Sequence, residues 1–96
     1  MHAALSQLDP NAMPRLPRGV RLHRDATRGV WLLLAPETVF EVNAAAVEIL
    51  RRCTGTVTLS DVVADITHAS GQQPARIAQD VQALLQTLRE KRLLDL

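Results

Sequence analysis

The side chains that could act as nucleophiles, proton carriers or metal ligands are few and far apart in this sequence. None of the three histidines, His2, His23 and His68, has a second ligand at the spacing that metal binding requires. Cys53 falls on the apolar stripe of an expected helix, so we predict a buried, inert thiol rather than a nucleophile with a base beside it. The carboxylates stand singly, and only folding would bring an acid and a base together. We therefore predict a protein that is not an enzyme and that needs no metal or other cofactor.

The bulk composition fits one small domain. The chain has 96 residues, 47% of them hydrophobic, and its only aromatic residues are Trp31 and Phe40, so we expect an aliphatic core. A single cysteine excludes an internal disulfide. The first residues show no signal-peptide pattern, and no apolar run has the length of a membrane span. These features favour a cytoplasmic protein with no membrane partner.

Positive charge is concentrated in one stretch, although the net charge is only +1. Five arginines fall between residues 15 and 28, where Asp25 is the only acid: Arg15, Arg18, Arg21, Arg24 and Arg28. Scattered surface charge commonly serves solubility. The alternative is a docking surface for an acidic partner.

Three short strands are expected before any helix. Residues 20–25 alternate imperfectly, residues 30–35 form a continuous apolar run, and residues 38–42 alternate clearly. Gly29 allows a turn between the first two strands, and Pro36 ends the second. The pattern predicts a meander or a winged hairpin.

From residue 43 the apolar period changes to that of helices. Asn43 and Thr58 are suitable N-caps, the latter with Asp61 three residues on, and Pro74 suits the first turn of a third helix. Thr54-Gly55 and Ser70-Gly71 end the first two helices, and Arg89, Lys91 and Arg92 lie at the end of the third. Residues 93–96 are expected to add a short closing strand.

This order predicts an α+β domain of winged helix-turn-helix type, in which a small three-stranded antiparallel sheet is followed by a three-helix bundle. Residues 1–17 hold three prolines and no hydrophobic period, so we expect a flexible N-terminal arm there and the winged helix-turn-helix domain at residues 18–96.

An ordered series of short motifs resembles the pyrroloquinoline quinone (PQQ) biosynthesis protein D family. The series covers about residues 14–94 and consists of Pro14-Arg15-Leu16-Pro17-Arg18-Gly19-Val20, Asp25 with Arg28-Gly29, Leu34-Ala35-Pro36-Glu37, Asn43-x-x-Ala46-x-x-Ile49-Leu50-x-x-Cys53-x-Gly55, Thr58-x-x-Asp61-Val62 and Asp80-Val81-x-x-Leu84-Leu85-x-x-Leu88. Two positions depart from the family pattern. Thr54 replaces a frequent acid, and Lys91-Arg92-Leu93 replaces a Lys-Gly-Leu turn, which leaves the end of the last helix open.

The resemblance implies a peptide chaperone of the recognition-element type. Such a protein binds the ribosomally made precursor peptide and presents it to a radical S-adenosylmethionine (SAM) enzyme, which joins a glutamate to a tyrosine. It also implies that the peptide adds as a strand to the edge of the third strand, against the third helix. An unpaired strand edge can bind an extended peptide through its backbone, whatever its side chains.

On this reading the peptide-binding residues form two groups. The strand edge comprises Thr38, Val39, Phe40, Glu41 and Val42, and the helix wall comprises Arg76, Ile77, Asp80, Val81 and Leu84. The apolar members of both groups would serve equally well as core. The five arginines are the candidate surface for docking the enzyme.

Two alternatives remain. A DNA-binding winged helix would need a basic recognition helix, but residues 73–88 contain one cation and one acid, Arg76 and Asp80, so we expect no nucleic-acid partner. A second copy of the chain could pair with the same strand edge and form a homodimer.

Overall fold

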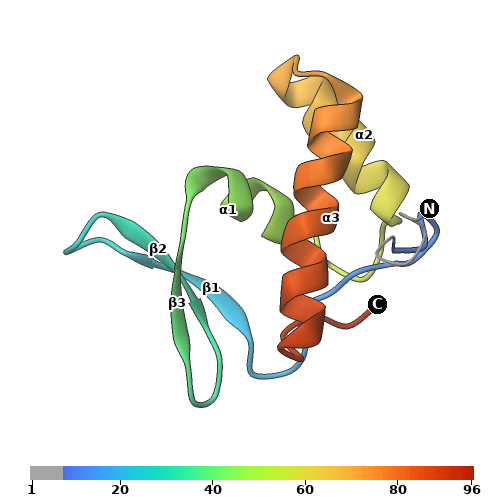
Figure 1. Ribbon diagram of the computed structural model, residues 1–96. Coiled ribbons are helices and arrows are strands. Elements are labelled where there is room, and N and C mark those ends of the chain that lie inside the picture. Colours follow the sequence, from blue (N-terminus) through green and yellow to red (C-terminus); the bar gives the residue numbers. More distant parts are fainter. Residues whose placement is uncertain (1–7) are drawn as a thin grey trace.

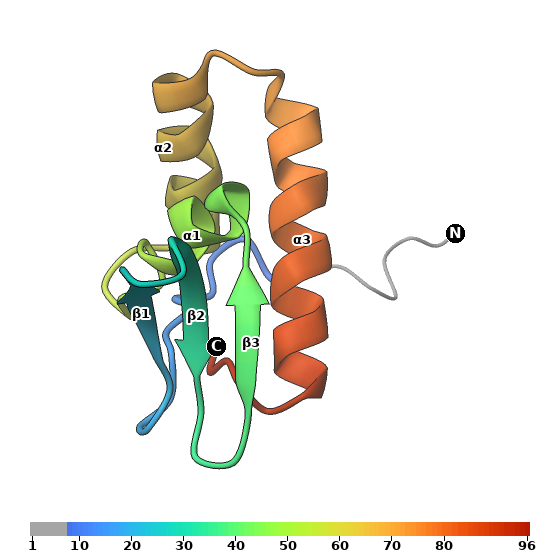
Figure 2. The same cartoon turned by 90° about the vertical axis from the view of Figure 1, so that its left-hand side faces the viewer.

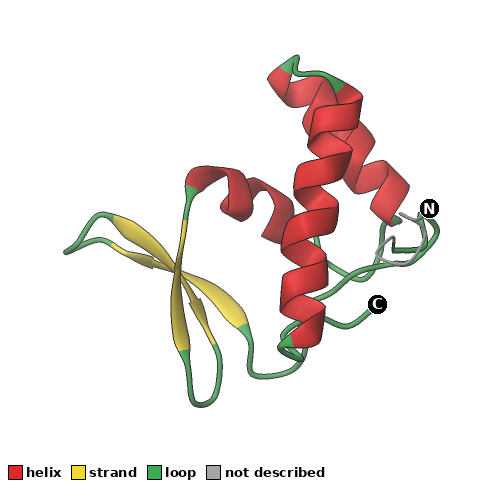
Figure 3. Ribbon diagram, viewed as in Figure 1, coloured by secondary structure: helices red, strands yellow, loops and turns green. Residues whose placement is uncertain are grey.

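The computed structural model describes residues 8–96, and in them a small antiparallel sheet precedes three helices (Figures 1 and 3). The strands are β1 (Arg21–Asp25), β2 (Val30–Leu34) and β3 (Val39–Val42), and they lie in the order β1-β2-β3. The helices are α1 (Ala44–Leu50), α2 (Leu59–Ser70) and α3 (Pro74–Glu90). This arrangement confirms the predicted α+β fold.

Local sequence accounts for both strand connections. In the β1–β2 turn the Asp25 carboxylate accepts the Arg28 N–H at 3.1 Å, and Gly29 takes the positive φ of 70° that the turn requires. Ala35 and Thr38 exchange backbone hydrogen bonds at 2.9 and 3.4 Å and so close the β2–β3 hairpin. The hairpin sets a register in which Phe40 lies opposite Leu33 and Val42 opposite Trp31.

The helices begin at the predicted caps. The Asn43 side chain accepts the Ala46 N–H at 2.8 Å, and the Thr58 hydroxyl accepts the Asp61 N–H at 3.1 Å. Helix α2 ends at Gly71, which has a left-handed φ of 70°. Helix α1 is shorter than expected: it ends at Leu50, and residues 51–52 form a turn before the buried Cys53.

The core is aliphatic, as predicted, and lies between the sheet and the helices. Its most buried side chains include Leu33 of β2, Leu50 of α1, Val62 of α2 and Leu85 of α3, and no polar or charged residue of the described chain is buried with them. Figure 2 shows that the opposite face of the sheet is left uncovered by the helices. None of the helices in residues 8–96 is long and apolar enough to cross a membrane.

The expected flexible arm differs from the structure over residues 8–17, while residues 1–7 lie outside the described chain. Leu8 is 3% exposed within the core cluster, and its N–H donates to the Gln82 side chain at 2.8 Å. Pro14 is also buried. The physical reason is that isolated apolar residues can bury surface without any periodic pattern that a sequence would reveal.

The chain after α3 turns back through a strained residue. Arg92 has a φ of 62°, and it is the only non-glycine residue of the described chain with positive φ. The Leu93 N–H then donates to the Leu88 carbonyl at 2.8 Å, which is the bond of a Schellman helix end. The predicted closing strand is a single bridge in which Asp95 pairs with Arg15.

Candidate functional site: the free edge of strand β3

Strand β3 leaves one edge without a strand partner. Its neighbour on one side is β2, and no described strand pairs with its other side. In Figure 2 α3 lies on that open side of β3, and Figure 1 shows that the two elements stand apart. An open edge presents unpaired N–H and C=O groups that a further strand can satisfy.

The register shows which backbone groups face the open edge. In antiparallel pairs, residues that exchange hydrogen bonds alternate with residues that do not. The exchange between Ala35 and Thr38 therefore makes Phe40 and Val42 the residues bonded to β2. The N–H and C=O groups of Val39 and Glu41 then point away from β2, out from the open edge of the sheet.

Side chains of β3 alternate between the two faces of the sheet. Phe40 and Val42 are half-buried and pack against the core, whereas Val39 is 60% exposed and Glu41 is exposed on the opposite face. Glu41 accepts a hydrogen bond from the Arg28 guanidinium at 3.3 Å. Thr38, the remaining member of the predicted edge, is exposed in the hairpin turn.

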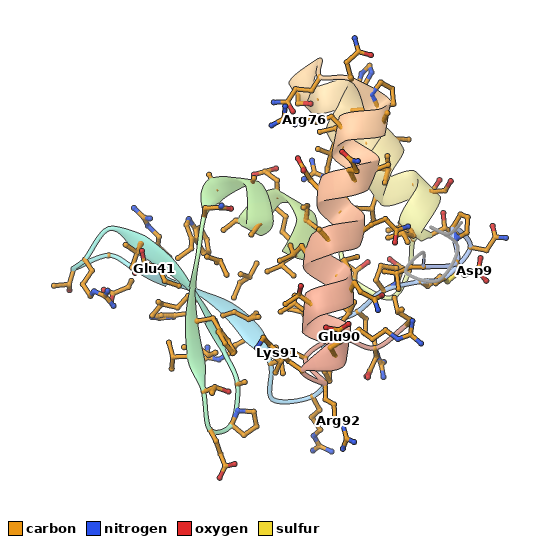
Figure 4. The ribbon with its side chains drawn as sticks, in the orientation of Figure 1. Asp9, Glu41, Arg76, Glu90, Lys91 and Arg92 are labelled. Carbon is orange, nitrogen blue, oxygen red and sulfur yellow. The ribbon has the colours of Figure 1, made fainter. Side chains whose placement is uncertain are left out.

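Helix α3 contributes only part of the predicted wall. Asp80 and Leu84 line an open cleft of about 460 Å³ between α3 and the start of α1, together with Ala83 on α3 and with Asn43, Ala45, Ala46 and Ile49. Ile77 and Val81 are 6% and 0% exposed and belong to the core. Arg76 lies at the start of α3, at the opposite end of the helix from Lys91 (Figure 4). Its guanidinium Nε lies 4.0 Å from the Asp80 carboxylate.

That ion pair also bears on DNA binding. Arg76 and Asp80 are the only charged residues between positions 73 and 88, and they face each other. The exposed surface of α3 over this stretch therefore carries no net charge with which to neutralise phosphates.

Sequence reasoning did not include Lys91, the residue that caps the end of α3, in the candidate site. The Lys91 ammonium lies 5.8 Å from the centre of the Phe40 ring, so it joins the end of α3 to β3. Figure 4 shows Lys91 between the helix end and the sheet. A signal was present in the sequence, since Lys91 follows Leu84 by seven residues and so continues the same helical face.

Two larger hollows, of about 680 and 640 Å³, lie along α2 rather than beside β3. The first is lined by α2 and by the loop between α1 and α2, and the second by α2, α3 and the segment around Leu8. Neither is bordered by a strand edge. We therefore place the candidate site for an extended chain at β3, where backbone groups are available.

The five arginines do not form one cluster. Arg15 pairs with Asp95 at 3.8 Å, Arg24 stacks over Trp31 at 5.9 Å, and Arg28 contacts Asp25 and Glu41. Arg18 and Arg21 are exposed before and within β1, the strand at the opposite edge of the sheet. Arg21 and Arg24 stand on opposite faces of β1 because they are an odd number of residues apart.

The one cysteine of the described residues is buried. Cys53 is 5% exposed, and its thiol donates to the Ile49 carbonyl at 3.3 Å. Burial raises the pKa of this thiol to about 11, so it is protonated at neutral pH. The described residues also contain no group of three potential metal ligands.

The geometry defines a class of protein: a small α+β domain whose open strand edge, backed by a helix, suits the binding of an extended peptide. The family model described as "Coenzyme PQQ synthesis protein D (PqqD)" matches residues 31–94. A "PqqA binding protein" of Xanthomonas oryzae pv. oryzae is 38% identical over 92 residues, which cover 96% of this chain and 100% of the relative. The chain therefore belongs to the PqqD family.

Solved structures of PqqD proteins are also similar to this chain. The solution structure of the PqqD truncation of Methylobacterium extorquens PqqCD, described as a functional and stand-alone RiPP (ribosomally synthesized and post-translationally modified peptide) recognition element, matches with a TM-score of 0.80 and 35% identity, covering 95% of this chain and 97% of its own. The crystal structure of PqqD from Xanthomonas campestris matches with a TM-score of 0.60 and 36% identity, over 94% and 100% of the two chains. A bifunctional coenzyme PQQ synthesis protein C/D of Methylorubrum extorquens is 39% identical over 83 residues, which are 86% of this chain and 22% of that protein.

Proposed function

We propose that this protein binds the PQQ precursor peptide PqqA and presents it to a radical SAM enzyme that crosslinks a glutamate and a tyrosine. Family membership and the names of the relatives support the choice of peptide. The observation that carries the proposal is the open edge of β3, where the backbone groups of Val39 and Glu41 point away from β2.

The mechanism of binding is strand addition. The peptide extends the sheet by one strand, so its backbone bonds to Val39 and Glu41 while alternate side chains point toward α3. Asp80 and Leu84 meet one of those side chains in the cleft beside Asn43. Ile77 and Val81 pack in the core and hold this face of α3 in place, and Arg76 at the start of the helix does not contact the peptide.

While the peptide occupies the β3 edge, the radical SAM enzyme must contact another surface of the protein. Arg18 and Arg21 are exposed and unobstructed by the β3 edge, so among the five arginines they are best placed to meet an acidic enzyme surface while peptide is bound. A homodimer formed through β3 would compete with the peptide, because both would use the same backbone groups.

A capture experiment tests the proposal. The immobilised protein is incubated with PqqA, with the radical SAM enzyme, and with both together. We expect the peptide to be retained with or without the enzyme, and the enzyme to be retained with or without the peptide. Capture of neither molecule would refute the proposed function, and capture of the peptide alone would remove the enzyme from it.

A further inference from the structure

The candidate site consists of the open edge of β3 and the cleft beside α3. Near the end of α3, the cation Lys91 lies where a strand added to β3 would place a side chain. The Lys91 ammonium lies 5.8 Å from the centre of the Phe40 ring. Phe40 is half-buried on the core-facing side of β3, whereas Lys91 is exposed. Among residues 8–96 no carboxylate forms an ion pair with Lys91.

Strand addition determines which peptide residue meets this pair. A strand that bonds to the backbone of Val39 and Glu41 has one residue between those contacts, directly opposite Phe40. That residue points to the same face of the sheet as Phe40, so its side chain is directed toward the Lys91 ammonium.

The charge at this end of the helix favours an acid in that position. Residues 89–92, at the end of α3 and just after it, contain three cations, Arg89, Lys91 and Arg92, against the single carboxylate of Glu90. A carboxylate beside Lys91 would be partly shielded from water by the Phe40 ring, which strengthens its attraction to the ammonium.

The opposite end of the site has a different character. The peptide residue two positions away, opposite Val42, points toward the cleft that Ala45, Ala46 and Leu84 line. These side chains are small or aliphatic and match an aliphatic residue. One end of the site is therefore cationic and the other is uncharged and apolar.

We infer that Lys91, held against Phe40, is a specificity-determining residue that binds an acidic side chain of the peptide, two positions from an aliphatic one that enters the cleft. This inference rests on the proposed function and names the peptide chemistry that the site selects. Because the two side chains differ in charge, they also fix the register of the bound peptide.

Binding of fluorescent PqqA tests the inference, with Lys91→Gln compared against Arg92→Gln. Both substitutions remove one positive charge, but Arg92 hangs below the helix end, away from the sheet (Figure 4). We expect Lys91→Gln to weaken binding about fivefold, Arg92→Gln by less than about twofold, and Lys91→Arg to restore most of the affinity.

A second set of measurements identifies the partner of Lys91. Each acidic residue of the peptide is replaced in turn by its amide, Glu by Gln or Asp by Asn. One replacement should weaken binding to the wild-type protein about fivefold and have no further effect on Lys91→Gln. Equal losses for Lys91→Gln and Arg92→Gln, or peptide effects that simply add to that of Lys91→Gln, would overturn the inference while leaving peptide binding intact. Absence of binding to the wild-type protein would instead contradict the proposed function itself.

Discussion

At the scale of single residues, Arg92 shows how the chain tolerates a departure from its family's pattern. The sequence comparison expected a Gly at this turn, and the structure keeps the same helix end with Arg92 in the left-handed region, at φ 62°. A side chain with a Cβ is disfavoured there by about 1–2 kcal/mol per residue. The strain is local and stands beside Lys91, the cation of the proposed peptide site.

Arg92→Gly should stabilise the protein. Relief of the strained backbone, offset in part by the greater freedom of glycine in the unfolded chain, is expected to raise the free energy of unfolding by about 0.5–1 kcal/mol. Urea unfolding measures the change. Gly71→Ala is the converse control, because Gly71 has φ 70° and no heavy atom within 4 Å of an added Cβ, so only backbone strain would act. Destabilisation by Arg92→Gly would show that the turn is not strained.

Residue-level prediction from sequence succeeded where a local rule applies. The caps Asn43 and Thr58 follow from side-chain chemistry, and the structure confirms them. It also confirms that Cys53 is buried, although α1 ends before this residue. Leu8 escaped prediction because one apolar residue among prolines has no period. Lys91 escaped prediction because a charged residue at a helix end is usually explained by the helix dipole alone.

At the scale of elements, α1 and α2 are joined by a guanidinium. Arg52 donates to the Glu48 carboxylate at 2.8 Å and to its carbonyl at 2.7 Å, and it also reaches Asp65 of α2 at 2.6 Å. Its side chain is only 21% exposed. The hydrogen bond from Arg52 is the main cause that lowers the pKa of Glu48 below 4.5.

Arg52→Ala should therefore destabilise the protein by about 1–2 kcal/mol, whereas Arg51→Ala, which removes one exposed contact at 3.3 Å, should cost less than about 0.5 kcal/mol. The stabilisation contributed by the ionised Glu48 carboxylate is present above pH 4.5, and it is lost as the pH falls through the lowered pKa of Glu48. Arg52→Ala should also reduce this loss of stability in acid. Equal effects of the two alanine variants in thermal unfolding would contradict the assigned role of Arg52.

The edge of β3 can be tested as an element by removing one outward N–H. Glu41→Pro deletes that donor without removing a hydrogen bond to β2, since Glu41 does not exchange bonds with its partner Leu32. We expect PqqA binding to weaken at least about tenfold while the fold survives. Glu41→Ala is the matched control: it loses the same side chain and the contact with Arg28 but keeps the N–H. If the proline variant, shown to be folded by circular dichroism, binds as tightly as the alanine variant, strand addition at this edge is wrong.

Elements were more predictable than the site that they form. Periodicity and turn residues gave all three strands and all three helices, because each follows a local pattern. The wall of α3 was predicted only in part, because the helix face that looks toward the sheet is also the face that builds the core. Burial separates Ile77 and Val81 from Asp80 and Leu84, and a sequence pattern does not record it.

At the scale of the whole molecule, the described chain leaves one strand edge of its sheet open. Its core lies between one face of a small sheet and three helices, while β3 keeps an open edge beside α3 (Figure 2). A bound peptide would enlarge the sheet and bury further apolar surface, so binding should also stabilise the fold. In the Methylorubrum extorquens relative, the matched region is 22% of a longer chain, so the same domain occurs joined to another PQQ synthesis protein.

The most direct test of the central claim is a titration of the ¹⁵N-labelled protein with PqqA, followed by amide chemical shifts. If the peptide adds to β3, the largest changes will fall at residues 38–42 and along α3 around Asp80 and Leu84, with small changes in β1. Changes confined to the hollows along α2, with the amides of Val39 and Glu41 unmoved, would contradict this claim.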